Sequence, residues 1–175
     1  MTIDLHDYIA SIPDFPEAGI TFRDITPLLE DAKALSTATH VLAEYAKKQG
    51  ATVVVAPESR GFLLGTPIAI ELGIGFVPAR KPGKLPRKTI SESYTLEYGT
   101  ATLEINEDAI KPGDKVVIVD DLLATGGTIA ATNKLVERLG GQVVGLGFLI
   151  ELTELKGRDV LQGYDIHALM EYEGE

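Results

Sequence analysis

Hydrophobic positions along the chain change their spacing several times, and each change predicts a new element. Over residues 31–49, apolar side chains recur every three or four positions, which predicts an amphipathic helix that ends at Gly50. Residues 51–56 then form a short, β-branched and almost wholly apolar run, as expected for a strand covered on both faces. The apolar segment 61–72 closes with Gly73 and predicts a second helix.

The second half of the chain continues this alternation. Residues 93–98 and 100–105 flank Gly99 and predict either an antiparallel pair of strands or a bulged excursion. A turn at Lys111-Pro-Gly-Asp114 precedes another β-branched run. The remaining predicted elements are strands over residues 76–79, 115–119, 142–149 and, more weakly, 164–169, and a helix over about 128–139.

The start of the chain has a different character. Leu5, Tyr8, Ile9 and Ile12 fall at helical spacing and predict a helical turn, which the prolines that follow should end. We expect residues 14–25 to be irregular.

Strands that alternate with helices predict an α/β fold with a mainly parallel twisted sheet flanked by helices. The chain has no internal repeat or linker, so we treat residues 1–175 as a single domain. In such sheets ligands bind outside the carboxyl ends of the strands. The loops that follow strands are therefore the first places to look for chemistry.

Composition and charge narrow the classes of function. The chain of 175 residues has 16 Lys and Arg against 26 Asp and Glu, a net charge of -10 that disfavours nucleic-acid binding. Cysteine is absent, which excludes disulfides, thiolate zinc sites and cysteine nucleophiles. The apolar runs are too short to span a membrane, and the first residues do not resemble a signal peptide. We expect a cytoplasmic protein without membrane contact.

The main candidate site follows the strand over residues 115–119. Asp120 and Asp121 come first, and residues 124–128, Ala-Thr-Gly-Gly-Thr, then open a helix; we call residues 124–128 the phosphate loop. Glycines let the backbone curl around a ligand, and successive N–H groups at a helix start bind phosphate. The two carboxylates would repel a phosphate but accept hydrogen bonds from a vicinal diol, as in a ribose. Separately, each feature is more often a solvated strand end or a plain turn; in this order they predict a ribose 5-phosphate site.

Two further loops are candidate binding sites for an anion. Residues 56–61, Ala-Pro-Glu-Ser-Arg-Gly, follow a buried strand and could receive a second anion at a helix start. Residues 80–88, the basic loop, hold five of the 16 basic residues. The prolines and glycine in this loop favour a mobile lid over a strand, although a solvated surface loop is the alternative.

Residues 117–128 resemble the signature of the type I phosphoribosyltransferases, which bind phosphoribosyl pyrophosphate. Five other segments, spread in order over nearly the whole chain, are similar to the members of that family that act on adenine: residues 15–27, 58–62, 80–86, 93–99 and 151–157. The resemblance implies transfer of phosphoribose to adenine, which gives AMP and pyrophosphate in purine salvage. It also implies a small N-terminal hood over residues 1–30, which contributes to the base pocket, and a flexible lid over about 80–105.

The resemblance assigns roles to residues by position. The 5-phosphate is expected at Ala124, Thr125, Gly126, Gly127 and Thr128, and the ribose at the catalytic pair Asp120 and Asp121. Pyrophosphate is expected at Ser59, Arg60, Arg80, Lys81, Lys84 and Tyr98. Adenine is expected at Thr21, Phe22, Arg23, Arg60 and Leu152.

Glu97 is the expected proton-exchanging residue, because a carboxyl whose pKa is raised by lid closure can exchange a proton with the imidazole edge of adenine. An exposed strand glutamate is the alternative. The resemblance further implies Mg²⁺, held mainly by substrate oxygens and water with no direct protein ligand, and a homodimer in which part of the lid or Arg80 approaches the partner's site. Two other functions stay open: a phosphoribosyltransferase for another base, such as xanthine or orotate, and a non-catalytic sensor of the same ligand.

Overall fold

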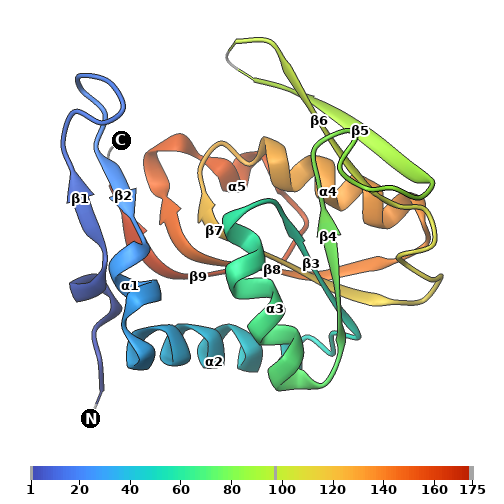
Figure 1. Ribbon diagram of the computed structural model, residues 1–175, viewed down its shortest axis with the longest axis horizontal. Coiled ribbons are helices and arrows are strands. Elements are labelled where there is room, and N and C mark those ends of the chain that lie inside the picture. Colours follow the sequence, from blue (N-terminus) through green and yellow to red (C-terminus); the bar gives the residue numbers. More distant parts are fainter. Residues whose placement is uncertain (1, 97, 174–175) are drawn as a thin grey trace.

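A five-stranded parallel sheet lies at the centre of the molecule in the computed structural model, which describes residues 2–96 and 98–173 (Figure 1). The strands are ordered β4-β3-β7-β8-β9, and every neighbouring pair is parallel. Their bounds are β3 (Val53–Pro57), β4 (Gly75–Ala79), β7 (Lys115–Leu123), β8 (Gln142–Leu152) and β9 (Ile166–Tyr172). The predicted α/β class is confirmed.

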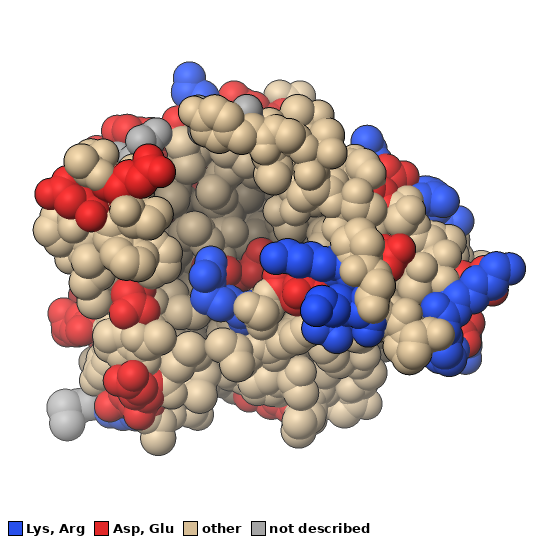
Figure 2. Space-filling model, turned by 45° about the horizontal axis from the view of Figure 1, so that its top comes forward, with Lys and Arg blue, Asp and Glu red and all other residues tan. Residues whose placement is uncertain are grey.

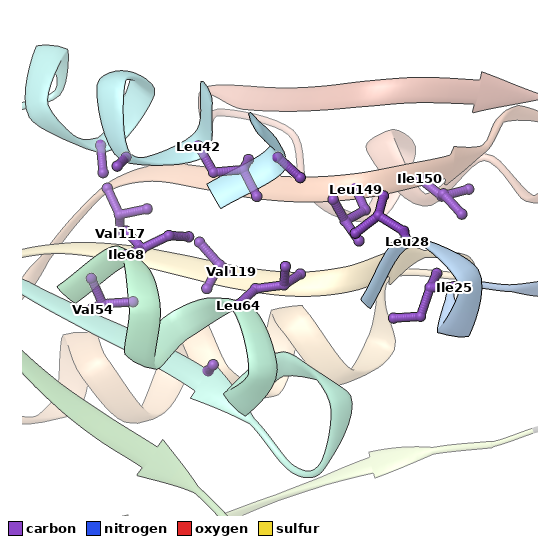
Figure 3. Close-up of a cluster of buried hydrophobic side chains, with 14 of the residues drawn as sticks. Ile25, Leu28, Leu42, Val54, Leu64, Ile68, Val117, Val119, Leu149 and Ile150 are labelled. Carbon is purple, nitrogen blue, oxygen red and sulfur yellow. The ribbon is translucent and has the colours of Figure 1, made fainter. Parts of the chain in front are cut away.

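Helices cover both faces of this sheet. On one face lie α1 (Thr26–Glu30), α2 (Ala32–Lys48) and α3 (Arg60–Leu72), and on the other lie α4 (Gly127–Arg138) and the hairpin of β5 (Thr89–Thr95) and β6 (Thr100–Asn106). Successive strand residues alternate between two cores, so that Val54 and Val117 pack with α2 and α3 (Figure 3) while Val55 and Ile118 pack with α4 and β6. Burial on both faces explains the continuous apolar runs in the sequence.

Helix ends agree with the local signals. Asp31 accepts a hydrogen bond from the backbone N–H of Ala34 at 2.8 Å and so caps α2. Gly73 ends α3 with a φ of 68°, a left-handed conformation that favours glycine. None of the helices in residues 2–96 and 98–173 is long and apolar enough to cross a membrane.

The N-terminal segment differs from the expectation. Only η1 (Leu5–Tyr8), a short 3-10 helix, is helical, and the chain then enters β1 (Ala10–Ile12). This strand pairs antiparallel with β2 (Phe22–Asp24), with Ile12 opposite Phe22, so the prediction that residues 14–25 are irregular throughout is wrong. Pairing across the intervening loop, a non-local interaction, overrides the helical spacing. In Figure 1 this β1–β2 pair stands beside β9.

The last elements are η2 (Thr153–Leu155) and α5 (Gly157–Val160), which connect β8 to β9. The strands β7 and β8 also run further than the apolar pattern predicts, to Leu123 and Leu152. Asp120 and Asp121 therefore lie within β7 and not beyond its end, because the ladder to β8 continues past them.

Candidate active site

The strand order reverses between β3 and β7, which are neighbours in the sheet although β4 to β6 separate them in sequence. At such a point the connections leave toward opposite faces, and a crevice opens at the carboxyl ends of the strands. A cavity of about 680 Å³ lies there, and Figure 2 shows a hollow on this side of the molecule with basic and acidic side chains gathered along its rim. Six residues singled out in the sequence line it together: Ser59, Arg60, Lys81, Asp120, Asp121 and Thr128.

Two adjacent carboxylates form the floor of this cavity. Asp121 is buried, and its backbone N–H donates a 2.9 Å hydrogen bond to Oδ1 of Asp120. Burial, and then the neighbouring Asp121 carboxylate, raise the pKa of Asp120 well above its usual range. The pair therefore favours a ligand that brings hydroxyl donors or positive charge.

Arg60 begins α3 and reaches the carboxylate pair from the loop after β3. Its Nε donates to Oδ2 of Asp121 at 2.5 Å. Burial alone would lower the pKa of Arg60, but the carboxylates of Asp121 and Asp120 outweigh it and raise that pKa above its usual value. A hydrogen-bonded ion pair thus joins the start of α3 to the strand β7.

The phosphate loop connects β7 to α4 as the sequence predicts. Gly126 has a φ of 89°, which favours glycine, and α4 begins at the next residue. The hydroxyl of Thr128 donates to the Tyr94 hydroxyl at 3.3 Å, so the β5–β6 hairpin closes against the loop. Backbone N–H groups at the start of a 12-residue helix are thereby placed next to the cavity.

The basic loop divides its charges between the cavity and the surface. Lys81 lines the cavity, whereas Lys84 is exposed. Arg80 donates from Nε to Oε1 of Glu58 at 3.2 Å, and the same oxygen accepts the backbone N–H of Lys81 at 2.8 Å. Burial would raise the pKa of Glu58, but these two contacts outweigh it and lower that pKa. At the far end of the loop, ion pairs join Arg87 to Asp108 at 2.6 Å and Lys88 to Glu107 at 3.6 Å.

A smaller cavity of about 230 Å³ lies under the hood. Phe22 and Arg23 line it, and Arg60 lines both this cavity and the larger one. The Phe22 ring meets Phe15 edge-on at 5.3 Å, and the Arg23 guanidinium lies 4.4 Å from the centre of the Tyr172 ring. Arg60 is therefore shared by the linings of the two cavities.

Some predicted site residues lie apart from both cavities. The side chain of Tyr98 is 88% exposed at the hairpin tip, and Leu152 packs in the core beside Ile25 and Leu28. Thr21 is half-buried and precedes β2. Glu97 lies outside the described residues.

The structure also adds residues to the site. Glu58 and the hairpin residues Tyr94 and Thr100 also line the large cavity, although the sequence analysis assigned no role to them. Glu58 precedes Ser59 in the loop 56–61, which the sequence analysis already identifies as a candidate anion site, so its position in the chain could have indicated a role. Tyr94 lies in the segment 93–99 that resembles the family, but only the folded hairpin brings it to Thr128.

Comparisons with known proteins agree with this geometry. Residues 24–167 match the phosphoribosyl transferase domain family. Curated adenine phosphoribosyltransferases from Lactobacillus delbrueckii subsp. bulgaricus and Lactobacillus gasseri are each 62% identical over 174 residues, which is 99% of this chain and 99% of each relative.

Solved structures give the same result. The adenine phosphoribosyltransferase of Thermoanaerobacter pseudethanolicus is 55% identical with a TM-score of 0.93, covering 97% of this chain and 100% of that one. The Saccharomyces cerevisiae enzyme, complexed with an imino-altritol bisphosphate and adenine, is 37% identical with a TM-score of 0.90, covering 94% and 96%. The chain therefore belongs to the phosphoribosyltransferase family and, within it, to the adenine phosphoribosyltransferases.

Proposed function

We propose that this chain transfers the 5-phosphoribosyl group from phosphoribosyl pyrophosphate to adenine and so produces AMP and pyrophosphate, a reaction of purine salvage. The observation that carries the proposal is the position of Arg60, which lines both the polar cavity beside the phosphate loop and the smaller cavity under the hood. A sugar phosphate and a flat base need two such adjoining spaces. The Trypanosoma brucei relative, 27% identical with a TM-score of 0.87, has been solved with AMP, pyrophosphate and ribose 5-phosphate.

The proposed step is a substitution at the anomeric carbon of the sugar. N9 of adenine forms a bond to that carbon as the bond to pyrophosphate breaks, with inversion, and the base loses its imidazole proton. The sugar becomes cation-like during the step, so nearby negative charge lowers the barrier. Asp120 and Asp121 are suited to accept hydrogen bonds from the ribose hydroxyls and to supply that charge.

The two phosphate ends of the substrate would take different partners. We assign the 5-phosphate to the phosphate loop at the start of α4, with Thr128 contributing its hydroxyl. Ser59, Arg60 and Lys81 line the cavity and are assigned to pyrophosphate. Arg80, Lys84 and Tyr98 stay assigned to pyrophosphate by family resemblance, although Arg80 bonds to Glu58 and the other two are exposed.

The hood would supply the base site. Phe22 lines the smaller cavity and offers a ring to stack on adenine, and the backbone at Thr21 and Arg23 is assigned to the edge of the base. Leu152 remains a proposed contact by resemblance, since it packs in the core. Glu97 is proposed, from the sequence, to exchange the proton of the imidazole edge.

We further propose Mg²⁺ as a cofactor. The donor groups of the large cavity, the Asp120 and Asp121 carboxylates and the Thr128 hydroxyl, are oxygens of the kind this hard cation binds. Arg60 already bonds to Asp121, so we assign the ion mainly to substrate oxygens and water. Bound there, Mg²⁺ would neutralise charge on the departing pyrophosphate.

A homodimer is also proposed. The proposal rests on the family resemblance, and α3 also exposes Ile70, at 75%, on a face that a second chain would cover. Sedimentation of the purified chain tests this proposal: one species of twice the chain mass supports it, and a monomer contradicts it. The single-domain organisation, with its hood and lid, and the cytoplasmic location remain predictions.

Product analysis tests the proposed reaction. Incubation of the chain with adenine, phosphoribosyl pyrophosphate and Mg²⁺ should yield AMP and pyrophosphate in equal amounts, separated by chromatography. Hydrolysis of phosphoribosyl pyrophosphate without AMP would contradict the proposal.

A further inference from the structure

Backbone atoms of the phosphate loop lie against α5, a later segment of the chain. A Cβ atom placed on Gly157 would lie 2.5 Å from the carbonyl oxygen of Ala124 and 2.8 Å from Cδ1 of Leu123. A Cβ atom placed on Gly126 would in turn lie 2.9 Å from the carbonyl oxygen of Gly157. A side chain at either glycine would therefore need space that atoms of the facing segment already fill.

The requirement at Gly157 is steric and not conformational. Gly126 has a φ of 89°, which favours glycine by itself, whereas Gly157 is not among the glycines with positive φ. Any L-residue could adopt the Gly157 backbone, and only the close approach of Ala124 and Leu123 opposes it. The approach of the phosphate loop therefore requires glycine at position 157, whereas the backbone conformation of α5 does not.

An ion pair between the half-exposed Arg158 and the buried Glu151 connects α5 to the sheet. Nε of Arg158 lies 3.0 Å from Oε1 and 2.9 Å from Oε2 of Glu151, whose side chain is only 7% exposed. Glu151 lies near the end of β8, directly opposite Leu123, the last residue of β7. The ion pair thus connects α5 to the strand position beside the entrance of the phosphate loop.

We infer that Gly157, held by the Glu151–Arg158 ion pair, positions the phosphate loop for the 5-phosphate of the substrate. A cradle of backbone N–H groups works only when successive peptide planes are fixed, and the Ala124 carbonyl belongs to the peptide plane that carries the N–H of Thr125. The close packing of Gly157 against the Ala124 carbonyl restrains this peptide plane. This inference rests on the proposed function, because it assigns the loop to that ligand.

Two glycine variants make a matched test. Gly157→Ala adds a methyl group against the Ala124 carbonyl, whereas Gly75→Ala, at the start of β4, adds one where no atom lies within 4 Å. We expect Gly157→Ala to raise the KM for phosphoribosyl pyrophosphate about 10- to 100-fold and to weaken ribose 5-phosphate binding, measured by calorimetry, to a similar degree. The KM for adenine should change less than about 2-fold, and Gly75→Ala should leave all three values unchanged.

The ion pair provides a second test if Gly157→Ala does not fold. Arg158→Gln should raise the KM for phosphoribosyl pyrophosphate about 3- to 10-fold, and Arg158→Lys should recover part of that loss because it keeps the charge. Unchanged ribose 5-phosphate binding in a folded variant, or equal rises in both KM values, would overturn the inference. If the unaltered chain binds ribose 5-phosphate but makes no AMP, the proposed function fails while the binding test of the loop still stands.

Discussion

Arg60 and Asp121 are joined by a 2.5 Å hydrogen bond from Nε to Oδ2. The two residues come from the start of α3 and from β7, so the contact ties together the ends of the two strands that flank the crevice. Asp121 is buried, whereas about half of the Arg60 side chain is exposed toward the cavities that it separates. A guanidinium fixed at one end by a carboxylate is thereby presented to both cavities.

Replacing Arg60 should affect both substrates. Arg60→Gln removes a charged donor shared by the two cavities, and we expect kcat/KM for adenine to fall about 100-fold, because hydrogen bonds to charged groups contribute about 1.5–3 kcal/mol. Arg60→Lys keeps the charge but loses the planar fork and should recover only part of the loss. Steady-state kinetics with each substrate varied measures the effect. Kinetics of Arg60→Gln equal to those of the unaltered chain would show that the guanidinium touches neither substrate.

Asp120 should make stability depend on pH. Its pKa is raised in the folded chain, so its contribution to stability is fully present below the unfolded pKa of about 3.9 and is lost as pH rises through the folded pKa. Asp120→Asn stays neutral and avoids that loss. We therefore expect the variant to have the higher Tm at neutral pH, with a difference that shrinks toward pH 4, together with lower activity. Thermal unfolding between pH 4 and 8 checks this, and a difference that is constant with pH contradicts it.

Two lysines of the basic loop form an internal comparison. Lys81 lines the large cavity, whereas Lys88 pairs with Glu107 outside it. Lys81→Gln should raise the KM for phosphoribosyl pyrophosphate about 10-fold, which corresponds to the loss of one charge-assisted hydrogen bond. Lys88→Gln should leave it within about 2-fold. Equal effects would mean that the loop acts only through its overall charge.

Glu97 tests the proton-transfer proposal, which rests on the sequence. Glu97→Gln should lower kcat about 100-fold, in the range of general acid–base catalysis, with little change in the Kd for phosphoribosyl pyrophosphate. Glu107→Gln, which alters a carboxyl in the surface pair with Lys88, is the control. Unchanged turnover in Glu97→Gln would remove that role.

The sequence was most informative where burial is continuous. The runs 51–56 and 115–119 predicted strands because both of their faces are covered, and Gly50, Gly73 and the phosphate loop marked real element ends. The hydrophobic pattern placed the end of β7 too early, because the pairing with β8 continues through Asp120 and Asp121 although these residues are polar. It failed again at β1 and β2, because strands of three residues are too short to show a period.

The candidate site likewise has one part that the sequence predicts and one part that it does not. The phosphate loop and the carboxylate pair were predictable because they are contiguous in the chain. The contacts of Glu58 with Arg80, of Tyr94 with Thr128 and of Gly157 with Ala124 join residues far apart in sequence. Such contacts depend on the strand order, which local spacing does not contain.

Pyrophosphate release tests the central claim most directly. The chain is supplied with phosphoribosyl pyrophosphate and Mg²⁺, and adenine, hypoxanthine, guanine, xanthine and orotate are offered separately. The account predicts release with adenine alone, because amino and oxo groups demand opposite hydrogen-bond partners from a buried site. Release with another base but not with adenine, or binding of phosphoribosyl pyrophosphate without release for any base, would contradict it.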